Sequence, residues 1–209
     1  MCWKCNDLKK RNIKTSSPKI AAYVPYMTCP GNHEHQHATY SEYRFRFPMP
    51  FLNEKQELHF SFDYGPIHFV SLNVEVYYKK GGQLSNVTSM YNWLQKDLHN
   101  VDRNLTPWVV VFGHRPMYCA MNDWNDCNTK IGKTRVGIEI NGTLQYGLEE
   151  LLYAHNVDIA IWAHIHSYER MWPVYNYTVF QHSYVNAKAP IHINSPSAVS
   201  GFLLSSKMI

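Results

Sequence analysis

Hydrophobic and polar residues alternate over two short stretches in the first half of the chain. Residues 59–64 and 68–73 each show this two-residue period, and Gly65-Pro66 stands between them. Successive side chains of a strand point to opposite faces, so the pattern indicates two half-buried strands joined by a turn. We therefore expect a β-hairpin here.

Other stretches show different periods. Residues 108–112 and 157–163 are rich in Val, Ile and aromatic side chains, which predicts two buried strands. Residues 89–98 and 144–155 repeat apolar positions three or four apart, which predicts helices. The short mixed segment 21–29 is expected to enter a further buried strand. Strands that alternate with helices are typical of an α/β domain.

Composition and charge narrow the functional classes. The 209 residues carry a net charge of +4 without a long Lys or Arg run, so no nucleic-acid partner is expected. No apolar stretch reaches the roughly 18 residues of a membrane span, and the polar start of the chain does not resemble a signal peptide. With 45% apolar and 14% aromatic residues, the chain is predicted to be globular, with one sizeable core.

Two features are more typical of proteins outside the cytosol. Cys119 and Cys127 could close a short disulfide loop. Four N-x-S/T sequons are also present, at Asn86, Asn104, Asn141 and Asn176. Cys29 precedes a Pro-Gly-Asn turn signal, and the simpler interpretation is a buried small hydrophobic residue.

Residues that can bind metals follow three of the predicted strands. They are Asn32 with His33, His114, and His164 with His166. Ligands of α/β sheets bind outside the carboxyl ends of the strands, where all five are expected to lie. In extended backbone His164 and His166 would point to the same face and could converge on one metal or two adjacent metals. Three imidazoles and an Asn carbonyl oxygen suit zinc, iron or manganese.

Taken singly, each motif has a plainer explanation, such as a hydrogen-bonded His pair or an ordinary turn. Their order, each after an apolar run, favours a metal site. Three stretches also carry a family resemblance: MTCPGNHE at 27–34, VFGHRPMYC at 111–119 and WAHIHSYERMWP at 162–173. Through them the chain resembles the purple acid phosphatases of the animal secreted type, within the metallophosphoesterase superfamily. The likeness runs from about residue 23 to residue 193.

The resemblance implies a fold, an activity and a location. The fold would be α/β, a metallophosphoesterase-like β-sandwich flanked by helices. The activity would be that of an acid phosphatase, which cleaves phosphate monoesters with a dinuclear metal centre of iron and a second divalent metal (Zn, Mn or Fe). The location would be secreted or lysosomal. The oligomeric state is left open.

The resemblance also assigns roles to residues. Asn32, His114 and His164 match ligands of the divalent metal, and His166 matches a ligand of the ferric ion. His33 matches the histidine that contacts the phosphate and helps the leaving group. In addition, Arg115 and Arg170 are candidates to hold or screen the site, although structural ion pairing would explain either. Tyr168-Glu169 is expected to support the His pair.

The chain departs from the family at both ends. The family's Asp-x-Gly and Gly-Asp-x-x-Tyr motifs, which supply two aspartates and a tyrosine, are not found before Gly31. We therefore expect an incomplete domain, truncated at its N-terminus: an irregular lead-in at 1–20, a partial metallophosphoesterase domain at 21–193 and a divergent tail at 194–209. The alternative to an enzyme is a catalytically impaired fragment or isoform that at most binds metal or a partner.

Overall fold

The computed structural model describes most of the chain. The described residues are 23–34, 40–47, 49, 58–78, 84–120, 127, 132–195 and 203–204. The helices are α2 (Ser41–Arg46), the 3-10 helix η2 (Val74–Tyr77), α3 (Leu84–His99), α4 (Lys133–Val136) and α5 (Leu148–Ala154). The strands are β1 (Phe60–Tyr64), β2 (Ile67–Ser71), β3 (Trp108–Gly113), β4 (Gly137–Ile140), β5 (Thr143–Tyr146), β6 (Ile159–Trp162), β7 (Ser167–Arg170), β8 (Val174–Tyr175), β9 (Thr178–Val179), β10 (Ile191–Asn194) and β11 (Leu203–Leu204).

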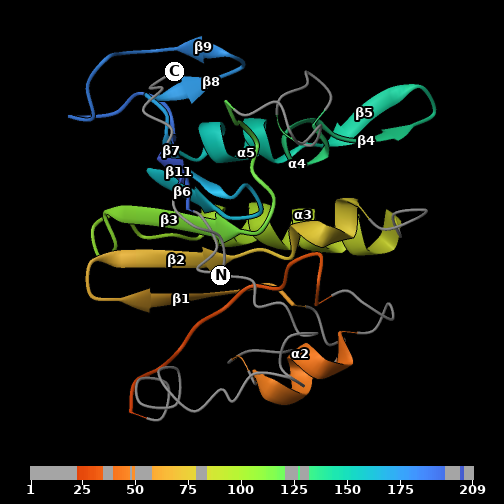
Figure 1. Cartoon of the computed structure of the whole chain (residues 1–209). Helices are drawn as coiled ribbons and strands as arrows, with labels where there is room; N and C mark the ends of the chain where they lie inside the picture. Colours follow the sequence, from red (N-terminus) through yellow and green to blue (C-terminus); the bar gives the residue numbers. More distant parts are fainter. Residues whose placement is uncertain are drawn as a thin grey trace.

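One large mixed sheet organises these elements, in the order β1-β2-β3-β6-β10-β7-β11 (Figure 1). β2, β3, β6 and β10 run parallel to one another, whereas β1 and β7 pair antiparallel with β2 and β10. The β1–β2 pair confirms the predicted hairpin. Its turn uses Gly65 at a positive φ of 56°, a conformation that costs glycine little.

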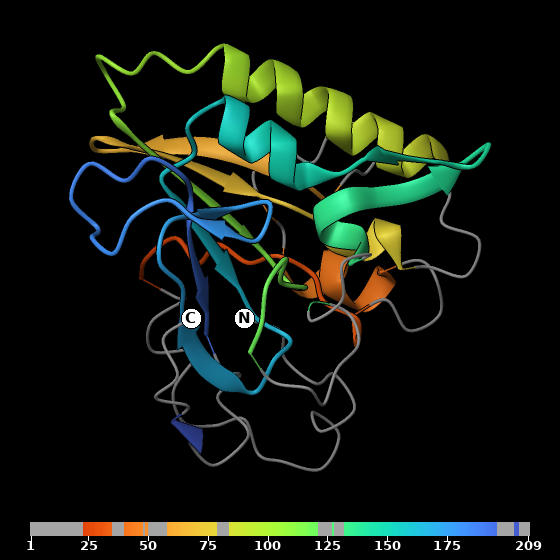
Figure 2. The same ribbon diagram turned by 90° about the horizontal axis from the view of Figure 1, so that it is seen from above.

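Helices α3 and α5 cover one face of this sheet (Figure 2). Val109 and Val111 of β3 face these helices and belong to the same buried cluster as Leu94 of α3 and Leu152 of α5. The expected α/β architecture is confirmed, because parallel strands and helices alternate along the chain as the hydrophobic pattern indicated. Among the described helices, none combines the length and apolar character needed to cross a bilayer.

The opposite face of the sheet carries the alternate side chains. Phe69, Val110 and Phe112 line a cavity of about 330 Å³ there, together with Met27 and Cys29 from the segment that crosses this face. The buried Cys29 is 4% exposed, as the sequence indicated, and burial raises the pKa of its thiol.

The strand expected over 21–29 is wrong for its described part, residues 23–29. Nearby side chains replace a strand ladder there: the Thr28 amide donates to Met49 Sδ at 3.3 Å and Tyr43 donates to the Thr28 carbonyl at 2.9 Å. Pro25 also has no amide hydrogen to give to a ladder. Residues 23–29 therefore cross the face of the sheet without forming a strand.

The two predicted helices are corrected in different ways. α3 begins at Leu84, earlier than the expected start at 89. The helix predicted over 144–155 is α5 only from Leu148 onward, and the residues before it form the β4–β5 hairpin. Asn141 and Gly142 both have positive φ, 50° and 79°, as a two-residue hairpin turn requires. The Asn-Gly pair was the signal that the helical spacing obscured.

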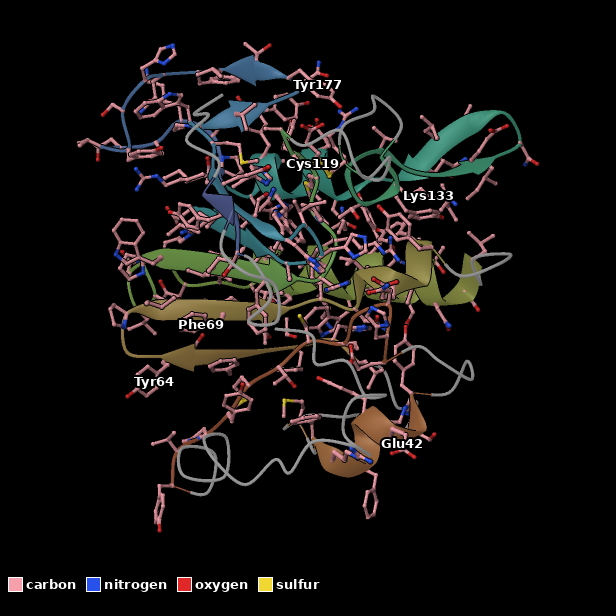
Figure 3. The ribbon with its side chains drawn as sticks, in the orientation of Figure 1. Glu42, Tyr64, Phe69, Cys119, Lys133 and Tyr177 are labelled. Carbon is pink, nitrogen blue, oxygen red and sulfur yellow. A yellow bond between two sulfur atoms is a disulfide. The ribbon has the colours of Figure 1, made fainter. Side chains whose placement is uncertain are left out.

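The predicted Cys119–Cys127 disulfide is present, with Cα atoms 5.5 Å apart (Figure 3). It links two residues of the segment between β3 and α4. At the other end of the domain, β10 extends to Asn194, which is fully buried. The sheet thus includes Asn194 and β11 from the segment 194–209 that was expected to diverge.

Candidate metal centre

Two neighbouring parallel strands bring His114 and His164 together. Gly113 at the end of β3 pairs with Trp162 at the end of β6, and each histidine follows closely. The Ala163 amide then donates to the His114 carbonyl at 2.9 Å. A Cβ at Gly113 would lie 2.9 Å from the Trp162 ring, so glycine permits this close approach before His114.

A tight turn supplies Asn32. The Glu34 amide donates to the Gly31 carbonyl at 3.2 Å, and the Gly31 amide donates to Glu34 Oε2 at 2.9 Å. Glu34 is buried, so both bonds are protected from water. They fix the backbone on either side of Asn32 and His33, which are both half-buried.

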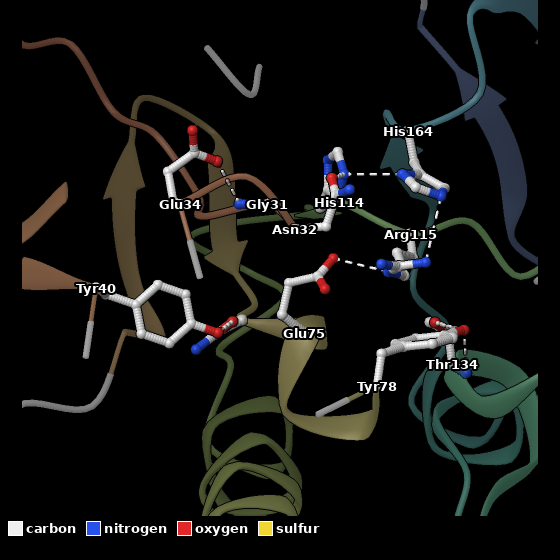
Figure 4. Close-up of polar contacts among 11 residues, drawn as sticks. Gly31, Asn32, Glu34, Tyr40, Glu75, Tyr78, His114, Arg115, Thr134 and His164 are labelled. Atoms are coloured by element: carbon white, nitrogen blue, oxygen red, sulfur yellow. Dashed lines mark hydrogen bonds and ion pairs between the residues drawn. The ribbon is translucent and has the colours of Figure 1, made fainter. Parts of the chain in front are cut away.

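Three polar atoms converge where these segments meet (Figure 4). Asn32 Oδ1 and His164 Nδ1 lie 2.8 Å and 3.0 Å from His114 Nε2. The two imidazole rings meet edge to face, with centroids 4.8 Å apart. The structure therefore brings three of the five predicted site residues into direct contact. In the sequence, His33 directly follows Asn32 and His166 lies two residues after His164.

The extended conformation expected for the His-x-His pair is wrong. His164 has a left-handed φ of 64°, and the chain bends from His164 to His166 before β7 begins. The bend is needed because β7 does not pair with β6; β10 lies between them. His164 is consequently buried and His166 exposed, so the two rings do not share one face of a strand.

The donor pattern of the cluster fits a cation. Arg115 Nη1 lies 3.2 Å from His164 Nε2, and a guanidinium can only donate, so the neutral His164 ring carries its proton on Nδ1. That proton points at His114 Nε2, which then has none to give to Asn32 Oδ1. If the Asn32 amide were flipped, its Nδ2 and His164 Nδ1 would both point a hydrogen at the single lone pair of His114 Nε2. A cation resolves this conflict, because it accepts lone pairs from all three residues.

One further observation on His114 agrees with this. Burial lowers the pKa of His114 well below its usual value, with His164 and Arg115 adding to the effect, so the ring stays neutral as a metal ligand must be. Its Nδ1 is buried and has no hydrogen-bond partner among the described residues. However, the described part of the chain contains no group of three or more His, Cys, Asp or Glu side chains placed to hold a metal. The candidate set is one Asn with two His.

Arg115 is anchored by residues that the sequence patterns did not single out. Its Nε donates to Glu75 Oε1 at 2.8 Å, and its Cζ lies 4.3 Å from the centre of the Tyr78 ring. Glu75 lies in η2, which follows β2 at the same edge of the sheet. Its position after a strand was the available signal, but a Glu between two valines looks like an ordinary surface residue.

Glu169 joins three segments of the chain close in sequence to the His pair. The buried carboxylate accepts bonds from Ser167 Oγ at 3.1 Å, the Ala120 amide at 3.1 Å and Asn194 Nδ2 at 2.8 Å. It thereby ties β7 to β10 and to the loop after β3. Arg170, the other candidate arginine, stacks over Tyr184 with its Cζ 4.6 Å from the ring centre, a structural contact.

Comparisons with known proteins agree on one family. The calcineurin-like phosphoesterase pattern matches residues 7–168. The chain is 45% identical over 185 residues to acid phosphatase type 7 of Homo sapiens, covering 86% of this chain and 41% of that protein. It is 35% identical to purple acid phosphatase 15 of Arabidopsis thaliana, covering 76% of this chain and 27% of that protein. This chain thus spans less than half the length of either relative.

A solved structure has a similar fold. Purple acid phosphatase from yellow lupin (Lupinus luteus) seeds superposes with a TM-score of 0.61 at 24% sequence identity. The match covers 82% of this chain and 30% of the lupin chain. At this identity the likeness concerns the arrangement of the sheet and helices.

Proposed function

Because this chain belongs to the calcineurin-like phosphoesterase family, we propose that it provides part of an acid phosphatase centre that cleaves phosphate monoesters. The resemblance carried by the three sequence motifs is confirmed by the match to animal acid phosphatases. The observation that carries the proposal is the convergence of Asn32 Oδ1, His114 Nε2 and His164 Nδ1 at the carboxyl edge of the sheet.

Each site residue has a proposed role. Asn32, His114 and His164 hold a divalent metal (Zn, Mn or Fe), and His166 contributes to an iron site. Bound metals of this kind polarise phosphoryl oxygens and lower the barrier to in-line attack. His33, in the turn beside Asn32, contacts the phosphate and gives a proton to the leaving group, a contribution of about 10²–10⁴-fold.

The charge of this ligand set limits metal affinity. All four proposed ligands are neutral, so they leave the charge of two cations uncompensated, and the Arg115 guanidinium adds a further positive charge nearby. A carboxylate bridge would normally hold two such metals about 3.5–4 Å apart. We therefore expect these residues by themselves to bind metal weakly or singly, with low turnover.

The comparisons favour the phosphatase over a chain that only binds metal or a partner, because the human relative and the Arabidopsis relative described above are named as acid phosphatases. Two structural features support a secreted or lysosomal location. The Cys119–Cys127 disulfide is typical of an oxidising compartment. All four sequon asparagines are exposed, as glycosylation requires.

Metal binding and hydrolysis by the purified 209-residue chain test the proposal. We expect weak, substoichiometric or single Zn²⁺ binding by calorimetry, and slow metal-dependent hydrolysis of p-nitrophenyl phosphate. His114→Ala should abolish both, whereas His99→Ala, at the exposed end of α3, should change neither. Metal binding that survives His114→Ala would contradict the site, and metal-independent hydrolysis would contradict the function. Tight binding of two metals would contradict the charge argument.

A further inference from the structure

Tyr78 joins the candidate metal site to helix α4. On the side of the site, Arg115 stacks on the Tyr78 ring with its Cζ 4.3 Å from the ring centre, and its Nη1 lies 3.2 Å from His164 Nε2. On the side of α4, the Tyr78 hydroxyl lies 2.9 Å from Thr134 Oγ1 and accepts a bond from the Thr134 amide at 3.2 Å (Figure 4). Thr134 is fully buried, so these bonds fix the start of α4 beside the site.

Lys133, the first residue of α4, brings a second cation to the same ring (Figure 3). Its Nζ lies 6.0 Å from the centre of the Tyr78 ring, at the outer limit of a cation–π contact. Lys133 is exposed, and no carboxylate of the described residues forms an ion pair with it. Arg115, by contrast, has a Glu75 carboxylate oxygen 2.8 Å from its Nε. Lys133 therefore adds positive charge at the edge of the site.

The packing of α4 does not depend on this lysine. Thr134 bonds to Tyr78, and the buried Arg135 donates to Glu149 Oε2 at 2.8 Å and stacks over Tyr177 with its Cζ 4.5 Å from the ring centre. A cation–π contact that is both long and exposed adds little to stability. The charge of Lys133 is therefore available to a molecule that enters the site from solvent.

We propose that Lys133 is a specificity-determining residue that binds a second negatively charged group of the substrate. This inference rests on the proposed function: with the reacting phosphate at the metal ligands, Lys133 lies on the α4 side of the site, beyond Arg115 and Tyr78. The substrate class it favours is a phosphate monoester whose leaving group carries a carboxylate or a further phosphate. Lysine suits this role, because its ammonium is a point charge on a flexible stem and can follow an anion over several positions.

Two substrates that differ in one charge test the proposal. Phenyl phosphate and 3-carboxyphenyl phosphate carry the same reacting group, but only the second has an additional anion on its leaving group. The ratio of their kcat/KM values is measured with the Zn²⁺-loaded 209-residue chain, for the natural sequence and for Lys133→Met. A general change in metal content or folding cancels in this ratio. Lys96→Met, a change at an exposed lysine of α3, is the matched control.

We expect Lys133→Met to lower the ratio of 3-carboxyphenyl phosphate to phenyl phosphate about three- to fivefold, the size of an exposed charge pair. Lys133→Glu should lower the ratio further, because its carboxylate repels the substrate, whereas Lys133→Arg should keep it. In about 1 M salt the natural chain should approach the ratio of Lys133→Met, since charges more than about 3 Å apart are then screened. Lys96→Met should match the natural chain.

Each other outcome has a definite meaning. An unchanged ratio in Lys133→Met and Lys133→Glu, with phenyl phosphate still hydrolysed, would overturn the role of Lys133 and leave the proposed function standing. An equal fall in Lys96→Met would also overturn that role, because the effect would then come from net charge. If the Zn²⁺-loaded natural chain hydrolyses neither substrate, the proposed function and this inference are overturned together.

Discussion

His192 shows how strongly the environment of a single histidine decides its behaviour. It lies in β10, is 2% exposed, and accepts a bond from Trp162 Nε1 at 3.1 Å. Burial lowers its pKa to about 3, against about 6.5 in an unfolded chain. Between these values the unfolded state binds more protons than the folded state. Through His192 the free energy of unfolding therefore falls as the pH falls, and above about pH 6.5 this contribution is constant.

Replacing His192 should flatten this acid response. Between pH 7 and pH 5 the natural chain should lose about 2 kcal/mol of unfolding free energy through this residue. His192→Gln keeps an acceptor for Trp162 but does not titrate, so urea unfolding at the two pH values should differ by less. His182→Gln, an exposed histidine, should retain the natural slope. An unchanged slope in His192→Gln would show that another group is responsible.

For single residues, the sequence predicted which side chains form the site better than it predicted their geometry. It identified Asn32, His114 and His164 as residues of one site, and the structure brings them together. It could not assign Glu75, because a carboxylate's burial and its arginine partner depend on segments distant in the chain. It also assumed extended backbone at His164, whereas the bend there is imposed by where β7 pairs.

At the scale of helices and strands, His68 of β2 contacts both β1 and α3. Its Nδ1 lies 2.6 Å from Asp63 Oδ1 of β1, and its Nε2 lies 3.0 Å from Asp97 Oδ2 of α3. Burial works against the charged ring, but hydrogen bonds to Asp97 and Asp63 outweigh it and raise the pKa of His68. This contribution to stability is fully present below about pH 6.5 and is lost as the pH rises through the raised value.

Asp97→Asn should therefore destabilise the protein in a pH-dependent way. We expect a loss of about 1 kcal/mol in the free energy of unfolding at pH 5.5, as for a partly buried ion pair. The loss should be smaller at pH 9, because His68 loses its charge as the pH rises through its raised pKa. Glu139→Gln, an exposed carboxylate change on β4, should have little effect at either pH. A loss that is equal at both pH values would indicate packing instead of charge.

For strands and helices, hydrophobic periodicity gave some correct predictions and one wrong one. Strands with strong patterns, such as β2 and β3, were predicted within a few residues. The β4–β5 hairpin was missed because Leu144 fits the helical spacing of Leu148, Leu151 and Leu152. In the structure Leu144 is 52% exposed in a strand and the other three are buried in a helix. A hydrophobic spacing does not reveal which of its members is buried.

For the whole molecule, the Cys119–Cys127 disulfide is a cross-link close to the site. The cysteines are 8 residues apart, and a loop of that size stabilises by about 2–3 kcal/mol in the loop-entropy account. Cys119→Ser/Cys127→Ser should lower the free energy of unfolding by about that amount, measured by urea titration.

A reducing agent gives the control for this prediction. It should destabilise the natural chain by a similar amount and leave the double serine variant unchanged, since Cys29 is the free cysteine of the described residues. If reductant destabilised both proteins equally, the effect would not come from this disulfide.

The sequence alone determined the kinds of element and the chemical character of the site. Hydrophobic period is a local property, so it predicted the hairpin, the two buried strands and the polar residues that follow them. Register is not local: His114 and His164 are 50 residues apart and meet because β3 and β6 are parallel neighbours that end together. Tertiary structure likewise placed Arg115 between Glu75, Tyr78 and His164. Only the packing of distant segments could bring these four side chains together.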